Sequence, residues 1–490
     1  MMASTPNLET DLRQDLGKLP DGWSWARLGD VCDAWNGRAF KSTEWRNSGV
    51  PIVRIQNLKD PSAAYNYFQG DLDERHRVQA GDLLFAWSGT PGTSFGAHLW
   101  HGPVAALNQH IFNIRFDRNR VDPKYFRYAL NQNVTRYVAQ AQGGVGLAHI
   151  TKSKFMASYI PLAPLQHQKE IVAEIEKQFS RLDEAVANLK RVKANLKRYK
   201  AAVLKAAVEG KLTEEWRKQH PNVKPASDLL RRILAERLER REGKGKYTEP
   251  AALDSRALGR LPANWTWATV GQLSTLVQYG SSAKTSEKVN GIPVLRMGNI
   301  ENGRLVLKEL KYLPKCHAEF PALLLAKGDL LFNRTNSAEL VGKTAVYRGT
   351  PTPCSFASYL IRVRLNENYN PGFLSYYINS VYGRSWIAQV ISQQVGQANV
   401  NGTKLQALDV PFPPLAEQER IVTDVESRLS VIEELEAAAE ADLNRAAGLR
   451  QSILGRAFSG RFALTSEYLR GDASGDLPIA AEGERIYRQG

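Results

Sequence analysis

The chain repeats itself, and this internal duplication is the feature that most limits what it can fold into. The segment LPDGWSWARLGDV at 19–31 returns as LPANWTWATVGQL at 261–273, and IPLAPLQHQKEIV at 160–172 returns as VPFPPLAEQERIV at 410–422. Matching residues are 242 positions apart in the first pair and 250 apart in the second. Insertions are therefore confined to the front part of each half, whereas the rear part keeps a fixed length. Such a repeat predicts two copies of one structural unit.

The front part of each repeat is expected to be an α/β domain of the mixed α+β type. Short runs with β-branched and aromatic residues, VPIVRI at 50–55, GDLLFAW at 81–87 and IFNIRF at 111–116, predict strands. Residues 125–142 have the apolar spacing of a helix. Loops rich in Gly, Ser and Thr separate the strands, as in WSGTPGTSFGA at 87–97.

The rear part of each repeat is expected to be a long helix, over 165–210 in the first copy and 415–460 in the second. Pro164 stands just before the expected start, and Gly210 stands at the expected stop. Apolar residues at alternating steps of four and three run along the first copy and predict coiled-coil packing. Polar residues interrupt the same seam in the second copy.

Charge predicts that these two helices run antiparallel. Residues 186–210 carry a net charge of +6, and residues 416–435 carry a net charge of −4. An antiparallel pair brings these two segments side by side, whereas a parallel pair keeps them apart. The expected molecule has internal pseudo-twofold symmetry, with one globular domain at each end of the helical pair.

A linker and a tail complete the chain. The linker is expected to hold a basic helix that Ser227 caps and that ends near Gly243, and a solvated helix is favoured over one that contacts DNA. Its apolar stripe would consist of Leu230, Ile233, Leu234 and Leu238. The tail is polar and is expected to be disordered toward its end. The expected boundaries are 1–164 for the first domain, 165–210 for the first helix, 211–260 for the linker, 261–414 for the second domain, 415–460 for the second helix and 461–490 for the tail.

Composition indicates a basic protein of the cytoplasm. The chain has 65 Lys and Arg against 50 Asp and Glu, a net charge of +15, which suits a nucleic acid partner, although a basic surface alone is an equal reading. Its three cysteines are widely spaced and show neither a disulfide framework nor the spacing of a zinc site. No apolar stretch is long enough to span a bilayer, and residues 1–16 lack the apolar core of a signal peptide.

No catalytic constellation is found. The segment LVGKT at 340–344 resembles a phosphate-binding loop, but Ser337 occupies the position where that pattern needs its first Gly. His98 and His101 have no cysteine partners for a metal site. There is no Gly-x-Ser-x-Gly turn. The sequence therefore favours a binding protein over an enzyme.

The ordered motifs, each present twice, resemble the DNA specificity subunit of type I restriction–modification systems. The matching pairs are LPDGWSWARLGDV and LPANWTWATVGQL, PIVRIQNL and PVLRMGNI, GDLLF twice, IPLAPLQHQKEIV and VPFPPLAEQERIV, and AVLKAAVEGKLTEEWR and SILGRAFSGRF. The resemblance covers residues 20–460. The second copy departs from it after SGRFALTSE, where the Trp of the first copy is missing.

This resemblance implies a non-catalytic subunit of a DNA adenine methyltransferase and ATP-dependent endonuclease complex. Each front part would be a target recognition domain that reads one half of a split, asymmetric site in double-stranded DNA. The two helices would set the gap between the half-sites and dock two modification subunits that bind S-adenosylmethionine. Two restriction subunits that use ATP and Mg would complete the complex. The chain itself would bind no cofactor, no metal and no membrane.

Candidate DNA contacts are basic, amide and hydroxyl side chains in the front loops, because Arg and Lys bind phosphate or guanine while Asn and Gln pair with adenine. Arg54 and Asn57 recur as Arg296 and Asn299, which suits contacts to the DNA backbone, or a folding role in a turn. The full set is Arg38, Lys41, Arg46, Arg54, Gln56, Asn57, Ser88, Thr90, Thr93 and Ser94 in the first domain, and Lys284, Arg296, Asn299, Arg334, Thr335, Asn336 and Lys343 in the second.

Candidate contacts to the modification subunits lie at the helix starts and are Gln168, Lys169, Gln418 and Arg420. A glutamine near a helix start can also satisfy free backbone N–H groups, which leaves a structural alternative. Two other functions stay open. One is an interaction scaffold whose coiled coil holds other proteins, and the other is a self-sufficient nuclease, which the missing phosphate and metal motifs disfavour.

Overall fold

The computed structural model describes residues 16–60, 62–89, 94–134, 137–138, 148–239, 259–288, 290–394 and 397–462. The chain divides into two compact units, one built from residues 1–189 and 441–490 and the other from residues 190–440. Each unit holds one globular domain, the end of one long helix and the start of the other.

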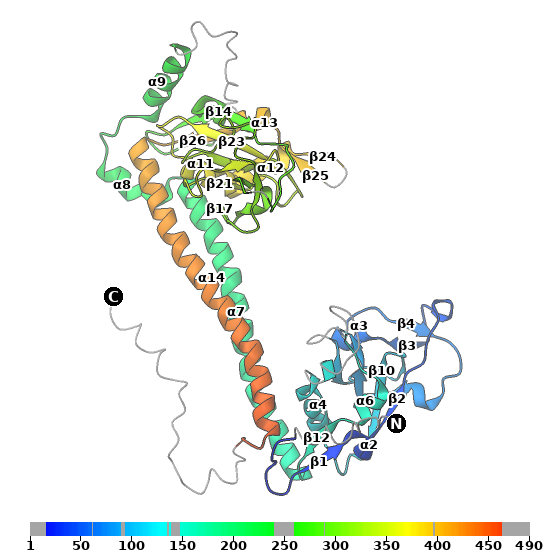
Figure 1. The fold of residues 1–490 in the computed structure, drawn as a ribbon. Coiled ribbons are helices and arrows are strands. Elements are labelled where there is room, and N and C mark those ends of the chain that lie inside the picture. Colours follow the sequence, from blue (N-terminus) through cyan, green and yellow to red (C-terminus); the bar gives the residue numbers. More distant parts are fainter. Residues whose placement is uncertain are drawn as a thin grey trace. The chain divides into compact units, whose positions relative to one another are not determined.

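The first domain is built on two four-stranded sheets (Figure 1). The antiparallel sheet has the order β2-β10-β6-β8, and the mixed sheet has the order β4-β3-β9-β5 with β3 and β9 parallel. The predicted strands at 50–55, 81–87 and 111–116 are β3, β6 and β10. The strands are β2 (Cys32–Asn36), β3 (Val50–Val53), β4 (Asn66–Phe68), β5 (Arg77–Val78), β6 (Leu83–Ala86), β8 (Gly96–Leu99), β9 (Ala105–Leu107) and β10 (Ile111–Phe116).

The main buried cluster of the first domain lies against its antiparallel sheet, and two smaller clusters lie at the mixed sheet. Helix α4 (Pro123–Gln132) covers the antiparallel sheet, and its Tyr125 and Phe126 are fully buried beside Phe85 and Phe112. Asp122 caps α4 by accepting hydrogen bonds from the backbone N–H groups of Lys124 and Tyr125 at 2.9 Å. The helix expected at 125–142 corresponds in its first part to α4, which begins two residues earlier and ends at Gln132; residues 135–136 and 139–142 lie outside the described residues.

The second domain repeats this plan. Its antiparallel sheet has the order β14-β23-β19-β21, and a smaller mixed sheet has the order β18-β15-β22. Between η4 (Met297–Asn299) and β18 the chain forms the hairpin β16–β17, whereas the first domain has a short turn between α3 (Ile55–Lys59) and β4. The strands are β14 (Ser274–Tyr279), β15 (Ile292–Leu295), β16 (Ile300–Glu301), β17 (Arg304–Leu305), β18 (Lys311–Leu313), β19 (Leu330–Asn333), β21 (Thr344–Val346), β22 (Ser355–Phe356) and β23 (Leu360–Leu365).

The repeated motifs of the sequence form the joint between each domain and its helix. Strand β1 (Ser24–Arg27) pairs antiparallel with β12 (Tyr159–Leu162), and β13 (Thr266–Thr269) pairs with β26 (Asp409–Phe412) in the same register. Each pair joins the first strand of a domain to the last strand, which leads into the long helix. The motif occurs twice because each domain pairs its first strand with its last strand at the same point before the long helix begins.

The two long helices are α7 (Leu165–Val208) and α14 (Leu415–Phe458), each of 44 residues. Both end at a left-handed glycine, Gly210 and Gly460, each with φ of 70°. The predicted starts are confirmed, and each helix ends two residues before its expected boundary.

The helices are antiparallel in each unit. In the first unit Ile171 and Ile175 of α7 share a buried cluster with Ile453 and Phe458 of α14. In the second unit the end of α7, with Val203 and Ala207, packs in one cluster with Ile421 and Val425 of α14. The start of each helix thus lies beside the end of the other, as the charge pattern predicted (Figure 1).

Ion pairs between the helices follow the same charge pattern. Lys193 pairs with Glu440 in the second unit, and Arg450 pairs with Asp183 in the first. The apolar contact is narrower than the predicted seam, because Val192 and Tyr199 are 44% and 48% exposed. Two helices alone cannot cover every seam position.

The linker differs from the expected solvated helix. Helix α9 (Ala226–Glu239) packs on the second domain, with Ala226 and Ile233 buried in the same cluster as Leu273 and Val410. Arg237 donates a hydrogen bond of 2.5 Å to the carbonyl of Gly271. Ser227 lies inside α9 instead of capping it, and Gly243 lies outside the described residues.

A buried carboxylate fastens the linker to the second domain. Glu417, at the start of α14, has a side chain that is 1% exposed. It accepts hydrogen bonds from Trp265 Nε1 at 2.7 Å and Thr213 Oγ1 at 2.6 Å, and it forms an ion pair with Arg217. The segment GKLTEEWR after the first helix is thus held in place by the second repeat.

Replacing Glu417 by Ala is expected to lower the free energy of unfolding of the second unit. Removing one partner of a buried ion pair costs about 3–5 kcal/mol, and we expect the lower end because Arg217 retains some solvent contact. Thermal unfolding and hydrogen exchange of the 211–219 backbone would report the change. Glu419→Ala, at an exposed position two residues further on, is the control. Equal exchange in both variants would contradict this role for Glu417.

Candidate nucleic-acid interface

Several loops of the second domain meet at one edge. We call this the loop edge: residues 279–286, 296–299, 333–337, 357–360 and 397–402. Backbone hydrogen bonds join these loops: Ser358 N–H to Ser281 O at 2.8 Å, Arg334 N–H to Tyr359 O at 3.0 Å, and Val400 N–H to Arg334 O at 2.9 Å. Gly280 permits the approach, because a Cβ there would lie 2.3 Å from the carbonyl oxygen of Phe356.

Arg334 is the central side chain of the loop edge. Its guanidinium lies 4.9 Å from the ring centroid of Tyr279, and Nη1 donates to the carbonyl of Ser358 at 3.4 Å. The Tyr279 hydroxyl accepts a hydrogen bond of 2.7 Å from the Gly402 backbone N–H. Tyr279 and Tyr359 are 43% and 49% exposed. A cation and two aromatic rings therefore share one accessible surface, which suits a nucleic acid.

Other predicted residues of the second domain lie around Arg334. Thr335 accepts a hydrogen bond of 3.0 Å from Asn399, and the Asn336 amide lies 3.6 Å from the sulfur of Met297. Lys284 is exposed in the loop after β14. Lys343 is half-buried, and its carbonyl accepts from the backbone N–H of Asn333, at the end of β19.

The same edge of the first domain carries different chemistry. Trp87 follows β6 as Arg334 follows β19, and its ring lies 5.3 Å from His110 and 4.7 Å from His149. Ser88 is half-buried in the short strand β7 (Ser88–Gly89), which pairs with β11 (Ala148–His149). Ser94 is buried beneath Gly89. Thr90 and Thr93 lie outside the described residues.

In the basic loop of the first domain, residues 38–46, two of the three predicted DNA contacts bond to other groups of the same domain. Arg38 lies 4.9 Å from the ring of Phe40 and 4.7 Å from that of Phe68, and it forms an ion pair with Glu44. Arg46 donates hydrogen bonds of 2.9 Å to two backbone carbonyls of the same loop. Lys41 is exposed, so it is the member of this group most available to a phosphate.

Asn57 and Asn299 have the folding role that the sequence left open. They are 1% and 3% exposed, and each accepts a hydrogen bond from the backbone N–H of the arginine three residues earlier, at 3.0 and 2.9 Å. Their amides also donate to backbone carbonyls. Neither amide is presented to a DNA base.

The predicted DNA contacts next to these asparagines, Arg54, Gln56 and Arg296, differ in how exposed they are. Arg54 lies 5.2 Å from the ring of Trp45, and Gln56 is exposed, donating a weak hydrogen bond to the carbonyl of Ala64 at 3.3 Å. Arg296 is half-buried and donates to the carbonyl of Glu309 at 2.8 Å. Gln56 therefore remains a candidate for base reading in the first domain.

Burial corrects the role expected of Gln168 and Gln418. Both side chains are fully buried. Gln168 Oε1 accepts from the Asp122 backbone N–H at 2.8 Å, and Gln418 Oε1 accepts from the Asn370 backbone N–H at 2.7 Å. Each amide also donates to two backbone carbonyls. They join domain and helix within this chain in place of contacting a partner.

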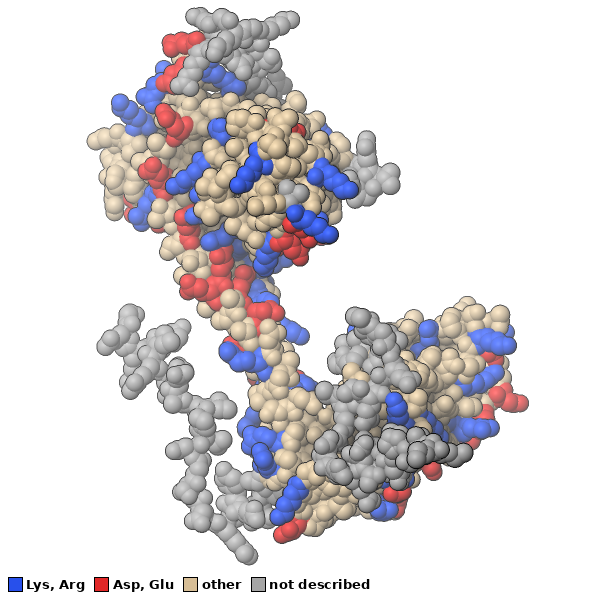
Figure 2. All heavy atoms as spheres, in the orientation of Figure 1, with Lys and Arg blue, Asp and Glu red and all other residues tan. Residues whose placement is uncertain are grey.

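The other two predicted partner contacts lie on the surface. Lys169 is exposed on α7, and Arg420 is exposed on α14, where its Nε lies 3.4 Å from Asp424. Figure 2 shows acidic side chains gathered over the helical segment next to the second domain, whereas Lys and Arg are spread over the domain itself. These carboxylates lie beside the basic end of α7, as in the ion pair of Glu440 with Lys193.

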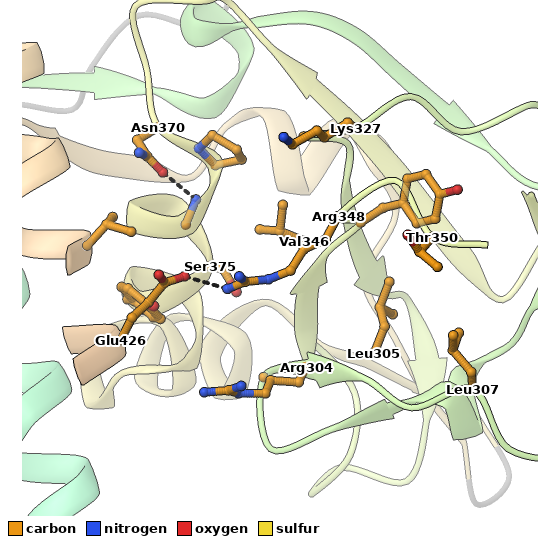
Figure 3. Close-up of a pocket in the computed structure, with 17 residues that line it drawn as sticks. Arg304, Leu305, Leu307, Lys327, Val346, Arg348, Thr350, Asn370, Ser375 and Glu426 are labelled. Carbon is orange, nitrogen blue, oxygen red and sulfur yellow. Dashed lines mark hydrogen bonds and ion pairs between the residues drawn. The ribbon is translucent and has the colours of Figure 1, made fainter. Parts of the chain in front are cut away.

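A pocket of about 560 Å³ lies where the second domain meets α14. Figure 3 shows Leu305 and Leu307, from the hairpin β16–β17 and the chain after it, on one side, and Glu426 of α14 on the other. Arg348 pairs with Glu426 across it. Burial raises the pKa of Tyr376 in its lining to about 12, so this phenol stays neutral. Within the described ranges, no group of three or more His, Cys, Asp or Glu could hold a metal ion, here or elsewhere.

Sequence reasoning missed the aromatic members of the loop edges. Trp87, His110 and Tyr359 stand singly in loops and Tyr279 ends β14, so no periodicity in the sequence marks them as one group. The available signal was the offset of 247 between GDLLFAW and GDLLFNR, which makes Trp87 and Arg334 equivalent. Among the helices that the structure describes, none is long and apolar enough to cross a membrane.

Two copies of one domain, with different polar loops on one scaffold, define a protein with two separate recognition surfaces. A family model described as the type I restriction modification DNA specificity domain matches the chain twice, over residues 20–198 and 262–444. The chain therefore belongs to the family of type I restriction–modification DNA specificity subunits.

Known proteins agree with this assignment along nearly the full chain. The EcoBI specificity subunit of Escherichia coli is 25% identical over 96% of this chain and 92% of its own length. The EcoKI specificity subunit of Escherichia coli strain K12 is 24% identical over 96% of each. The crystal structure of the HsdS subunit from Thermoanaerobacter tengcongensis matches with a TM-score of 0.52 at 19% identity, covering 91% of this chain and 99% of that one. That structural match establishes a shared fold.

Gln418→Ala is expected to destabilise the joint between the second domain and α14. It leaves the backbone N–H of Asn370 and two carbonyls without their partner, and each unsatisfied buried group costs about 1–3 kcal/mol. Thermal unfolding and hydrogen exchange of residues 366–372 would measure the loss. Arg420→Ala, two residues away and exposed, should leave both unchanged. An equally stable Gln418→Ala chain would show that the buried amide has no such role.

Proposed function

We propose that this chain is the DNA specificity subunit of a type I restriction–modification complex, and that each domain reads one half of a split, asymmetric site in double-stranded DNA. The observation that carries this proposal is the pair of loop edges. They share two equivalent backbone hydrogen bonds, yet they present Trp87 with two histidines in one domain and Arg334 with two tyrosines in the other. Two equal scaffolds with unequal side chains suit two different half-sites.

The helices α7 and α14 would set the gap between the half-sites and dock two modification subunits. Equal length and antiparallel pairing support a spacer of fixed size. Lys169 and Arg420 are the exposed residues through which we expect docking. The modification subunits would supply S-adenosylmethionine and methylate an adenine in each half-site, and two restriction subunits would supply ATP-driven cleavage. This chain would contribute recognition and no catalytic group, in the cytoplasm where the DNA lies.

Mapping of methylated adenines tests the proposal directly. A genome that carries this gene and its partner subunits should show methylation at one split motif, with two short specified parts and a gap of constant length. Deleting this gene alone should abolish the pattern. Methylation without any shared motif would favour the alternative, an interaction scaffold with basic domains.

DNA binding by the assembled complex is expected to weaken steeply with salt. Lys and Arg contacts to phosphates release counterions, so a complex with 6–10 such contacts loses about 10³–10⁵ in affinity between 50 and 200 mM salt. Electrophoretic or fluorescence titrations with a specific duplex would give the slope. An affinity that stays flat over this range would contradict recognition through basic side chains.

Lengthening both helices of the spacer, α7 and α14, is expected to lengthen the gap between the two DNA half-sites and to leave the half-sites themselves unchanged. Four residues inserted in the middle of both α7 and α14 add about one helical turn, or roughly 6 Å, which is close to two base pairs of duplex. Methylation mapping should then show both half-sites unchanged and a longer gap. A change in either half-site would show that the helices do more than space the domains. An insertion in the surface loop at 220–225 is the control.

A further inference from the structure

One backbone position is equivalent in the two domains. Trp87 follows β6 and Arg334 follows β19. The backbone N–H of Trp87 donates to His110 O at 3.3 Å, and that of Arg334 donates to Tyr359 O at 3.0 Å. Their carbonyls accept from Ile150 N–H at 3.0 Å and Val400 N–H at 2.9 Å. The position is therefore fixed by the same two hydrogen bonds, whatever side chain it carries.

The side chain at this position meets its neighbours differently in each domain. The Trp87 ring stacks on Phe112 at 5.7 Å, lies tilted against His110 and is perpendicular to His149, so this position carries an aromatic ring in place of a cation. Arg334 lies over Tyr279, which the backbone N–H of Gly402 holds by its hydroxyl. Within the described residues, Trp87 Nε1 and Arg334 Nε are buried and have no hydrogen-bond partner.

The two unpartnered donors lie next to accessible groups in both domains. A buried N–H without an acceptor costs free energy, and both domains accept this cost at the same position. In each domain the donor lies beside exposed groups, His149 in the first and Tyr279 with Tyr359 in the second.

The ring of Tyr279 also limits how Arg334 can move. A guanidinium stacked on an aromatic ring and bonded to a carbonyl loses less conformational freedom when it binds, so its planar set of donors is ready for a pair of acceptors. On the major-groove edge of DNA, guanine presents such a pair in O6 and N7. Trp87 lacks this donor pair, and its apolar ring suits a thymine methyl group.

We propose that the position of Trp87 and Arg334 determines the base that each domain accepts, with Arg334 reading a guanine in the half-site of the second domain. This inference rests on the proposed function and deepens it. Trp87 occupies the matching place in the first domain, so the half-site read there does not depend on a guanine at the corresponding base pair.

Methylation mapping with single variants of the full complex tests the assignment. Arg334→Ala should relax one G·C position of the second half-site, with discrimination against other bases falling about 5- to 150-fold, while the first half-site stays the same. Trp87→Phe should alter the first half-site only. Arg348→Ala is the matched control, because this arginine lies in the same domain but at the pocket beside α14.

Arg334→Lys separates reading from folding. Lysine keeps the charge and can lie over Tyr279, but it lacks the planar pair of donors. We expect Arg334→Lys to melt with the unaltered protein, to bind DNA with similar salt dependence and to lose the guanine preference. If Arg334→Ala fails to fold, this variant decides the question.

The outcomes that overturn the assignment are distinct from failure of the proposed function. An unchanged second half-site in Arg334→Lys, with normal methylation, would show that Arg334 reads no base. A changed first half-site in the same variant would show that the position does not act within one domain. If the unaltered complex methylates no split motif, the proposed function itself fails.

Discussion

Each domain is joined to the helix after it by a buried glutamine amide, and the placement of the reading loops depends on this joint. Gln168 and Gln418 each accept one backbone N–H from the preceding loop and donate to two carbonyls. A buried amide that loses these bonds is costly, so the joint has one favoured arrangement. A loop edge therefore moves together with its helix. A shift of the start of the helix displaces the whole domain without changing its internal structure.

Charged residues are arranged differently on the helices and on the domains. Acidic residues of α14 pair with basic residues of the second domain, as in Arg304 with Glu433 at 2.9 Å, and with the basic end of α7, as in Lys193 with Glu440. The acidic residues of α14 and the basic residues of α7 thus largely offset each other on this segment. The loop edge of the second domain, in contrast, presents an arginine beside accessible aromatic side chains.

Local patterns in the sequence were enough to predict the main strands, both long helices and the antiparallel orientation of the helices. Strand runs are set by short-range composition, and the helix ends are marked by Pro164 and Gly210. Charge could decide orientation because the acidic and basic segments are long. The docking of α9 escaped prediction, since a stripe such as Leu230 and Ile233 indicates a buried face without naming its partner.

The candidate site was harder to predict than the fold because its residues come from loops that meet only in three dimensions. Arg334, Thr335 and Asn336 were found through their chemistry, whereas Tyr279 and Tyr359 were not, since no spacing connects them with Arg334. Gln168 and Gln418 were expected to contact a partner because they stand at the starts of the helices on which the resemblance places docking, and only their burial shows otherwise.

Two prolines lie against the glycines that end the long helices. A Cβ on Gly460 would lie 1.9 Å from Pro20, and one on Gly210 would lie 2.8 Å from Pro262. The end of α7 therefore lies against the start of the second repeat, and the end of α14 lies against the start of the first. Equivalent contacts close both units at the same point, one through Gly210 and Pro262 and the other through Gly460 and Pro20.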